Sequence, residues 1–356
     1  HLMGRIASLC YTRFVKNGTP LALVSTDNCS HNGDKLKAGV MAYVDAWKQA
    51  GKVDDDFVSY MEEKVSFPWS MIDKITPRPD EKVKEMLEKD GFEDTDLIIT
   101  SRNTYTAPFV NSEETGYLVI EDNFPNGRPP LEKAGIVFTD RETVDKVEKM
   151  KVCTCLNPLH TALAIYGCML GHTSIHDEME DKELSQLIQK MCYEEAMPGV
   201  IDPKEFANAV LTKRLPNPFM PDTPQRIACD TSQKLPIRFG ETIKFYENRE
   251  DLDTKSLTLI PLVLAGWCRY LMGIDDEGNA FEQSPDPRLD EVKAHVAGIS
   301  FGDTDVHDKL QPILSDASIF AVDLYSVSLG EKVEKMFVEL IAGKGAIRST
   351  LKKYVD

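Results

Sequence analysis

The sequence predicts two parts: the closing portion of a doubly wound α/β domain, then a larger all-helical domain. Three observations support this fold class. A largely apolar strand follows an early helix, short strands recur up to about residue 140, and helical periodicity dominates from there to the end. We therefore expect the domains to cover residues 1–140 and 141–356.

The first helix and strand define the α/β part. Residues 4–17 carry apolar side chains at helical spacing, and Gly18 is a suitable helix stop. Residues 21–26 then form a short apolar strand of the kind buried in parallel sheets. Such a strand needs neighbouring strands to pair with, and none precedes it in the sequence. In addition, no glycine-rich phosphate-binding turn follows an early strand. We expect the chain to begin near the last helix–strand unit, with most of the nucleotide-binding half absent.

Periodicity assigns the remaining elements. Leu36, Val40, Val44 and Trp47 lie on one face of a helix. Strands are expected at 97–100, 117–120 and 135–138, separated by Pro and Gly turns. Helices are expected at 144–151, 158–170, 182–195, 203–213, 254–272 and 328–341.

Charge and composition exclude several kinds of partner. The net charge of -17 repels a phosphate backbone, so we expect no nucleic acid partner. An anionic small substrate would need a local group of Arg and Lys to overcome that field. No apolar stretch reaches the roughly 18 residues of a membrane span, and no secretory signal pattern opens the chain. We expect a cytoplasmic protein without membrane association.

The eight cysteines show no spacing typical of a disulfide scaffold or a four-ligand zinc site. Cys153 and Cys155, with His160 nearby, are the one arrangement worth testing as metal ligands. Buried apolar thiols are the simpler interpretation. We expect no bound metal.

The first polar cluster covers residues 26–33 and follows the apolar strand directly. In open α/β sheets, ligands bind at the carboxyl ends of strands, so substrate-facing groups belong here. The alternative is an ordinary loop in which Asn28 or Ser30 caps the next helix.

The second cluster runs from Glu148 to His160. Asn157 precedes Pro158, a preferred first helical residue, so Asn157 is either an N-cap or a site residue. His160 follows it by three positions and shares its helical face. Together with Lys151, these groups would suit proton transfer beside a carbonyl.

The third cluster contains Arg226, Asp230 and Lys234, spaced four residues apart. On a helix they would share one face, either as a solvated charge ladder or as a wall that binds substrate oxygens. Arg226, Lys234 and Arg238 would suit a carboxylate, but they would also hold hydroxyls.

These clusters together resemble the long-chain mannitol dehydrogenase family, which includes mannitol 2-dehydrogenase, fructuronate reductase and tagaturonate reductase. The motifs occur in order over most of the chain. The matching stretches are residues 25–33, 67–77, 119–129, 156–160, 232–236 and 265–276.

The resemblance implies an N-terminal Rossmann-type domain, an all-helical C-terminal domain and an active site between them. It also implies a metal-independent dehydrogenase that uses NAD or NADP on a sugar alcohol, hexonate or keto-sugar. Because the main cofactor loop should lie upstream of this chain, only Asp27 and Asn28 are expected to contact the cofactor. The chain alone is then expected to be inactive.

The resemblance also assigns roles to side chains. Lys151 matches the general acid/base, and Asn28, Asn157 and His160 match the groups that assist it around the carbonyl oxygen. Catalysis near neutral pH requires burial to lower the pKa of that lysine. The remaining residues match family positions in the same way. Glu148 matches a residue that gates proton exchange with water, and Arg226 and Lys234 match residues that hold substrate oxygens. Asp73 lies in a segment that matches part of the family's substrate site.

One departure from the family pattern predicts a local distortion. Lys151 and Asn157 are six residues apart, one more than in the family. One extra residue in a regular helix would rotate the lysine by about 100°, away from the site. Pro158 also removes a helical hydrogen bond here. We therefore predict a π-bulge or kink between Lys151 and Asn157.

Three functions remain open at this point. The first is a polyol or hexonate dehydrogenase, with a weak preference for fructuronate reductase over mannitol dehydrogenase. The second is a truncated, non-catalytic helical fragment that binds a substrate or a partner. The third is a zinc hydrolase that uses His31, Asp27 and cysteines. The oligomeric state is open.

Overall fold

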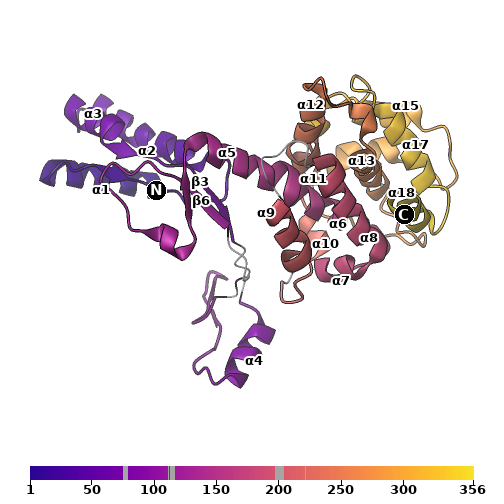
Figure 1. Ribbon diagram of the computed structural model, residues 1–356, viewed down its shortest axis with the longest axis horizontal. Helices are drawn as coiled ribbons and strands as arrows, with labels where there is room; N and C mark the ends of the chain where they lie inside the picture. Colours follow the sequence, from indigo (N-terminus) through magenta and orange to yellow (C-terminus); the bar gives the residue numbers. More distant parts are fainter. Residues whose placement is uncertain (75–78, 111, 113–116, 197–203, 221) are drawn as a thin grey trace. The chain divides into compact units, whose positions relative to one another are not determined.

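The computed structural model describes residues 1–74, 79–110, 112, 117–196, 204–220 and 222–356 (Figure 1). The chain divides into two compact units. The first comprises His1–Thr76 and Ser112–Glu148, and the second comprises Pro77–Asn111 and Lys149–Asp356. The domain boundary after residue 140 remains a proposal.

A layer of helices covers a short parallel strand pair in the first unit. Helices α1 (Leu2–Lys16), α2 (Asn32–Gln49) and α3 (Asp55–Glu63) pack together, and β1 (Leu21–Ala22) pairs with β2 (Val65–Ser66). Gly18, at φ +59°, follows the end of α1 as expected. The predicted strand 21–26 is only partly correct, because its ladder covers two residues.

The same unit contains a three-stranded sheet with β6 (Tyr117–Glu121) in its centre. Strand β3 (Ser70–Asp73) is antiparallel to β6, and β7 (Val137–Thr139) is parallel to it. The 3-10 helix η1 (Leu131–Ala134) precedes β7, and helix α5 (Arg141–Lys149) follows it. Met71, Val119 and Val144 form the buried core between this sheet and α5. The strands expected at 117–120 and 135–138 are present, each displaced by no more than two residues.

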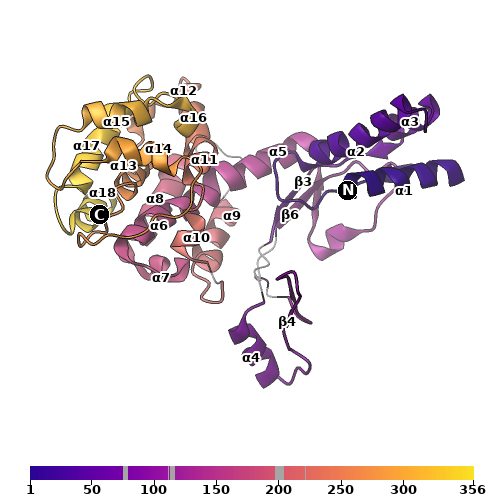
Figure 2. The ribbon, with the colours of Figure 1, turned by 180° about the vertical axis from the view of Figure 1, so that it is seen from behind.

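Residues 79–110 form a small helix and hairpin. Helix α4 (Glu81–Lys89) is followed by the antiparallel strands β4 (Ile98–Ile99) and β5 (Tyr105–Thr106) (Figure 2). The strand expected at 97–100 therefore exists. Its two isoleucines are about 60% exposed in this structure (62% and 59%), so the hairpin contributes no core.

From residue 149 onward the described chain is helical, with one isolated β-bridge between Ile274 and Ala280. The core of this unit is formed by α6, α13 and α17, whose facing side chains are almost all buried. The helices are α6 (Asn157–Leu170), α7 (Ile175–Glu180), α8 (Lys182–Lys190), α9 (Lys204–Ala209), α10 (Pro224–Ile227), α11 (Thr231–Leu235), α12 (Glu241–Glu247), η7 (Thr254–Ser256), α13 (Leu259–Tyr270), α14 (Leu289–Val296), α15 (His307–Leu314), α16 (Ala317–Phe320), α17 (Gly330–Leu340) and α18 (Ala346–Val355).

Four π-helical segments interrupt these helices within the described residues. They are η2 (Met150–Cys155), η3 (Met191–Ala196), η5 (Val210–Arg214) and η6 (Pro236–Gly240). A π-turn holds one residue more than an α-turn, and such turns are rare and occur frequently at functional sites. The predicted distortion between Lys151 and Asn157 is therefore confirmed as η2.

One helical stretch of the described chain, residues 141–170, is long and apolar enough to cross a membrane. However, 78% of its most apolar window is buried within the protein. A helix that is apolar on all sides and covered by other helices is typical of the core of a large globular domain.

Candidate functional site

Asn32 organises the polar loop of residues 26–31 in the first unit. Its side chain is 1% exposed. Nδ2 donates to the carbonyl oxygens of Asp27 at 3.0 Å and Ser70 at 2.9 Å, and Oδ1 accepts from the Ser70 amide at 3.0 Å. One buried carboxamide thus joins the loop after β1 to the start of β3. Sequence reasoning missed this role, because no local pattern identifies a partner 38 residues away.

The loop presents Asp27 and Asn28 to solvent, since both side chains are exposed. The expectation that Asn28 or Ser30 caps α2 is wrong. The N-cap is His31, which has the left-handed backbone conformation at φ 51° and makes no capping hydrogen bond with its side chain. His31 instead stacks on Trp69, with ring centroids 4.1 Å apart, and its Nε2 lies 2.9 Å from Oδ1 of Asp145.

Glu148 is bound to the same loop. The Ser30 hydroxyl donates to Oε1 of Glu148, and the His31 amide donates to Oε2 at 3.4 Å. Glu148 is only 9% exposed. The predicted proton gate therefore contacts the loop that carries Asn28, and it precedes Lys151 by three residues along the chain.

Lys151 lies in the π-turn η2, and its side chain is 5% exposed. The helix is broken immediately afterwards at Leu156, which has φ −129° and ψ −67°. The wide turn and the break accommodate the extra residue before Asn157. A buried lysine in a π-turn fits the desolvated setting that an acid/base lysine requires.

Asn157 begins α6, but it is not the N-cap, which is Leu156. Its carboxamide makes no hydrogen bond within the described part of the chain, whereas its carbonyl oxygen accepts from the Thr161 hydroxyl at 2.9 Å. The interpretation of Asn157 as only a helix cap is therefore wrong. A half-buried carboxamide that no described residue binds is available to a ligand.

His160 is a neutral imidazole in a buried setting. Burial, followed by the charges of Arg238, Arg226, Arg214 and Lys234, lowers the pKa of His160 to about 3. Nε2 lies 3.4 Å from Oδ2 of Asp222, and it is buried without a hydrogen bond to any described residue. His160 is thus suited to hydrogen bonding, and it does not serve as an acid near neutral pH.

The charges of four cations act on His160 and lower its pKa; we call these residues the basic cluster. Arg226 binds Asp222, with Nε to Oδ1 at 2.6 Å, and the Lys234 ammonium donates to the Ile227 carbonyl oxygen at 2.9 Å. Burial, and then the charge of Arg238, lowers the pKa of Lys234. The cluster comprises Arg214, Arg226, Lys234 and Arg238.

The proposed ladder of residues 226, 230 and 234 does not form. Asp230, at φ 53°, has the left-handed conformation and separates α10 from α11. The three side chains consequently do not share one helical face, and Arg226 pairs with Asp222 instead. Asp73 ends β3, but its side chain lies outside the described part of the structure.

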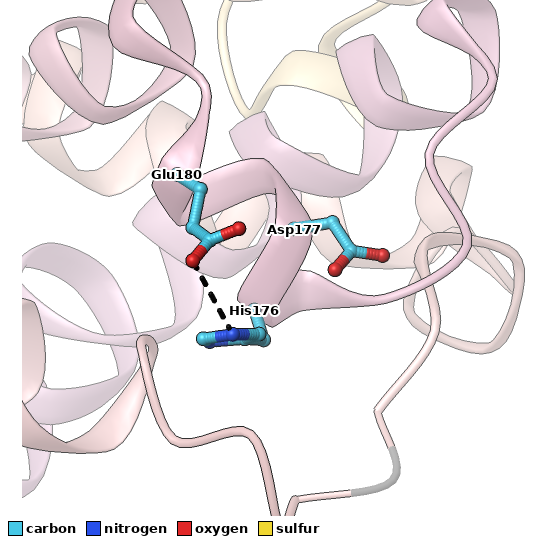
Figure 3. A group of neighbouring side chains, drawn as sticks. All are labelled: His176, Asp177 and Glu180. Carbon is cyan, nitrogen blue, oxygen red and sulfur yellow. Dashed lines mark ion pairs between the residues drawn. The ribbon is translucent and has the colours of Figure 1, made fainter.

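One group of possible metal ligands occurs in the described chain: His176, Asp177 and Glu180 on α7 (Figure 3). Nε2 of His176 lies 3.7 Å from Oε1 of Glu180, whose side chain is exposed. Exposed acidic groups of this kind are common without an ion. The group contains none of the residues that the sequence suggested as ligands: Asp27, His31, Cys153, Cys155 and His160.

Comparison with known proteins identifies both parts of the chain. The family model described as the mannitol dehydrogenase Rossmann domain matches residues 1–133, and that of the mannitol dehydrogenase C-terminal domain matches residues 143–340. The expectation that most of the Rossmann domain is absent is therefore not borne out, and neither is the expectation that the first part is only a remnant of that domain.

Individual relatives agree with this match. The chain is 55% identical to a D-mannonate oxidoreductase of Thermotoga maritima, over 99% of this chain and 67% of the relative. It is 31% identical to a mannitol 2-dehydrogenase of Neosartorya fischeri, over 97% and 63% of the two chains. The chain therefore spans about two thirds of the length of these relatives.

Solved structures show the same fold. A ternary complex of Pseudomonas fluorescens mannitol 2-dehydrogenase with NAD and D-mannitol matches with a TM-score of 0.69 and 25% identity, over 99% of this chain and 66% of that one. A substrate-free D-sorbitol dehydrogenase matches with a TM-score of 0.77 and 23% identity, over 100% and 66% of the two chains. With both of its domains matched, this chain belongs to the mannitol dehydrogenase family.

Proposed function

We propose that this protein is an NAD-dependent oxidoreductase that interconverts a hexonate such as D-mannonate with the corresponding keto acid. The basic cluster around His160 is the observation that carries the proposal. In a chain with a net charge of -17, the charges of four cations act on one imidazole, against the carboxylate of Asp222 beside it, and this local excess of positive charge favours an anionic substrate. The 55% identity to a D-mannonate oxidoreductase supports the same substrate class. Fructuronate would be the keto acid formed from D-mannonate.

The side chains divide the reaction between them. Lys151 accepts the hydroxyl proton during oxidation and returns it during reduction. The Asn157 carboxamide and the neutral His160 imidazole hydrogen-bond the substrate oxygen, and the family resemblance assigns the same task to Asn28. Glu148 relays the proton to solvent through the loop it binds. Arg226 and Lys234 hold substrate oxygens.

The loop after β1 fits a nicotinamide cofactor at its edge. Asp27 and Asn28 are exposed at the carboxyl end of a parallel strand, and Asn32 fixes the backbone beneath them. A bound nicotinamide cofactor would supply the hydride acceptor in its oxidised form and the hydride donor in its reduced form. NAD is favoured over NADP because a related mannitol 2-dehydrogenase was solved with NAD.

The two earlier alternatives have less support. A non-catalytic fragment is not favoured, because a relative described as an oxidoreductase matches 99% of this chain. The expectation of an inactive chain rested on a missing domain and loses that basis. The zinc hydrolase has little support from geometry, because Nε2 of its candidate ligand His31 is occupied by Asp145. A cytoplasmic location remains part of the proposal.

Lys151→Met tests the proposed function. NADH formation from D-mannonate should fall by about 10²–10⁴-fold in kcat, with a small change in KM, because the proton acceptor is lost. Lys146→Met is the matched control, since Lys146 is an exposed lysine of α5 paired with Glu142, and it should keep full activity. If the unmodified protein reduces NAD with D-mannitol but not with D-mannonate, the hexonate proposal is wrong.

A further inference from the structure

Arg238 occupies a distinctive position beside the proposed site. It lies in the π-turn η6, which packs against both η2 and α6, the segments that carry Lys151 and His160. Its Nη1 donates to the Thr161 hydroxyl, one residue after His160. The arginine is therefore tethered to the helix that carries the proposed oxygen-binding groups.

The charge of Arg238 is not neutralised by the described chain. Its hydrogen-bond partner Thr161 is uncharged, and no described carboxylate forms an ion pair with it or with Lys234. Arg226, by contrast, pairs with Asp222. Arg238 is half-buried, and this burial lowers the pKa of its guanidinium to about 10. A partly desolvated cation that no described carboxylate pairs with is costly, and an anionic ligand would offset that cost.

The guanidinium nevertheless retains binding capacity. It has five N–H donors arranged as a planar fork, and one of them is bound to Thr161. The fork matches the two oxygens of a carboxylate, whereas a substrate hydroxyl uses only one contact. In a six-carbon acid that reacts beside His160, the carboxylate is a few carbon–carbon bonds from the reacting carbon, and Arg238 is bound to the residue next to His160 on the same helix.

We propose that Arg238 binds the substrate carboxylate and is the residue that selects a hexonate over the corresponding polyol. The inference rests on the proposed function. Lys234 assists as the neighbouring cation, and the π-turn η6 directs Arg238 towards α6. The residue acts on specificity and takes no part in proton transfer.

D-mannonate and D-mannitol provide the test, because they differ at one terminal carbon: carboxylate against hydroxymethyl. For Arg238→Gln, kcat/KM with D-mannonate should fall by about 100-fold or more, mainly because KM rises. The value of kcat/KM with D-mannitol should change by less than about 3-fold. For Arg238→Lys, kcat/KM with D-mannonate should lie between the values of the unmodified protein and Arg238→Gln, because lysine keeps the positive charge but loses the planar fork of N–H donors. The exposed Arg249→Gln, whose arginine pairs with Asp251, is the control.

The outcomes separate this inference from the proposed function. An equal loss on both substrates by folded Arg238→Gln would show a structural role and overturn the specificity proposal, while D-mannonate activity of the unmodified protein would still support the function. If Arg238→Gln does not fold, Arg238→Lys decides: a selective rise in KM for D-mannonate supports the proposal, and an unchanged ratio of the two substrates overturns it. Thermal melting of each variant identifies the folded ones.

Discussion

Asn32 and Ser70 hydrogen-bond each other in both directions: Nδ2 of Asn32 donates to the Ser70 carbonyl oxygen at 2.9 Å, and the Ser70 amide donates to Oδ1 at 3.0 Å. The pair fixes the start of α2 against the start of β3. Because the same Nδ2 also holds the Asp27 carbonyl oxygen, the loop proposed to contact cofactor and substrate depends on one buried side chain.

Asn32→Asp should destabilise the protein by about 2–4 kcal/mol, because a carboxylate would face the carbonyl oxygens that the amide now serves. Urea denaturation measures the change. Asn248→Asp is the control, since its exposed amide makes a single bond to the Lys244 carbonyl oxygen, and it should shift stability by less than about 0.5 kcal/mol. Equal effects of the two variants would contradict the role assigned to Asn32.

Glu178 should make the fold less stable as pH rises. Its side chain is 0% exposed, neither carboxylate oxygen has a partner among the described residues, and burial raises its pKa well above 4.5. The folded state thus holds a proton that the unfolded state releases, so stability is complete below pH 4.5 and declines above it.

Glu178→Gln should remove this decline and stabilise the protein at neutral pH by about 1–3 kcal/mol, as measured by denaturation over a pH series. Glu180→Gln, on the same helix but 73% exposed, should leave the pH profile unchanged. An identical pH slope in Glu178→Gln and in the unmodified protein would refute the buried-acid interpretation.

His160 should remain neutral from about pH 5 to 8, because its pKa is lowered to about 3. Its contribution to stability is present above the unfolded value of 6.5 and is lost as pH falls below it, because the unfolded chain binds the proton there. NMR of ring-labelled histidines should show no titration of His160. The exposed His307, whose pKa is raised by hydrogen bonding to Glu334, should titrate above 6.5. A His160 midpoint near 6 would contradict the effect of the basic cluster.

Gly240→Ala should distort the π-turn that carries Arg238. A Cβ at this position would lie 2.3 Å from the Phe320 carbonyl oxygen and 2.6 Å from the Ala321 Cβ, neither of which is a flexible chain end. We expect a loss of about 1–3 kcal/mol and weaker D-mannonate binding. Gly39→Ala, also in a helix, meets the flexible Met3 side chain at 3.1 Å and should be neutral or slightly stabilising in thermal melts.

Local patterns predicted most elements of the fold. The helical spacing of Val40 and Val44 correctly placed α2, and the spacing from Lys151 to Asn157 correctly placed a π-turn. The length of the strand that begins at Leu21 was overestimated. Its partner β2 ends two residues before Pro68, which has no amide hydrogen for a sheet ladder, and apolar residues on one strand do not reveal the length of the other.

The candidate site was predictable only in part. Family motifs selected Asn157 and His160. The structure shows a carboxamide that no described residue binds and a neutral imidazole. The Arg226 ladder failed because a single left-handed residue, Asp230, redirected the chain. Asn32 and Arg214 gave no signal, because their importance depends on partners distant in sequence.

The π-turn at Met150–Cys155 also affects how relatives should be compared position by position. A π-turn accommodates one inserted residue without forming a loop. If such a chain is aligned without a gap to a relative that lacks the insertion, every residue on one side of the π-turn is matched to the wrong residue of the relative. Where a relative has one residue fewer in this stretch, the gap belongs between Lys151 and Leu156, inside a helix. Equivalent residues in this stretch are therefore best defined by superposed backbones, and substitutions transferred by numbering alone would fall on the wrong face of the helix.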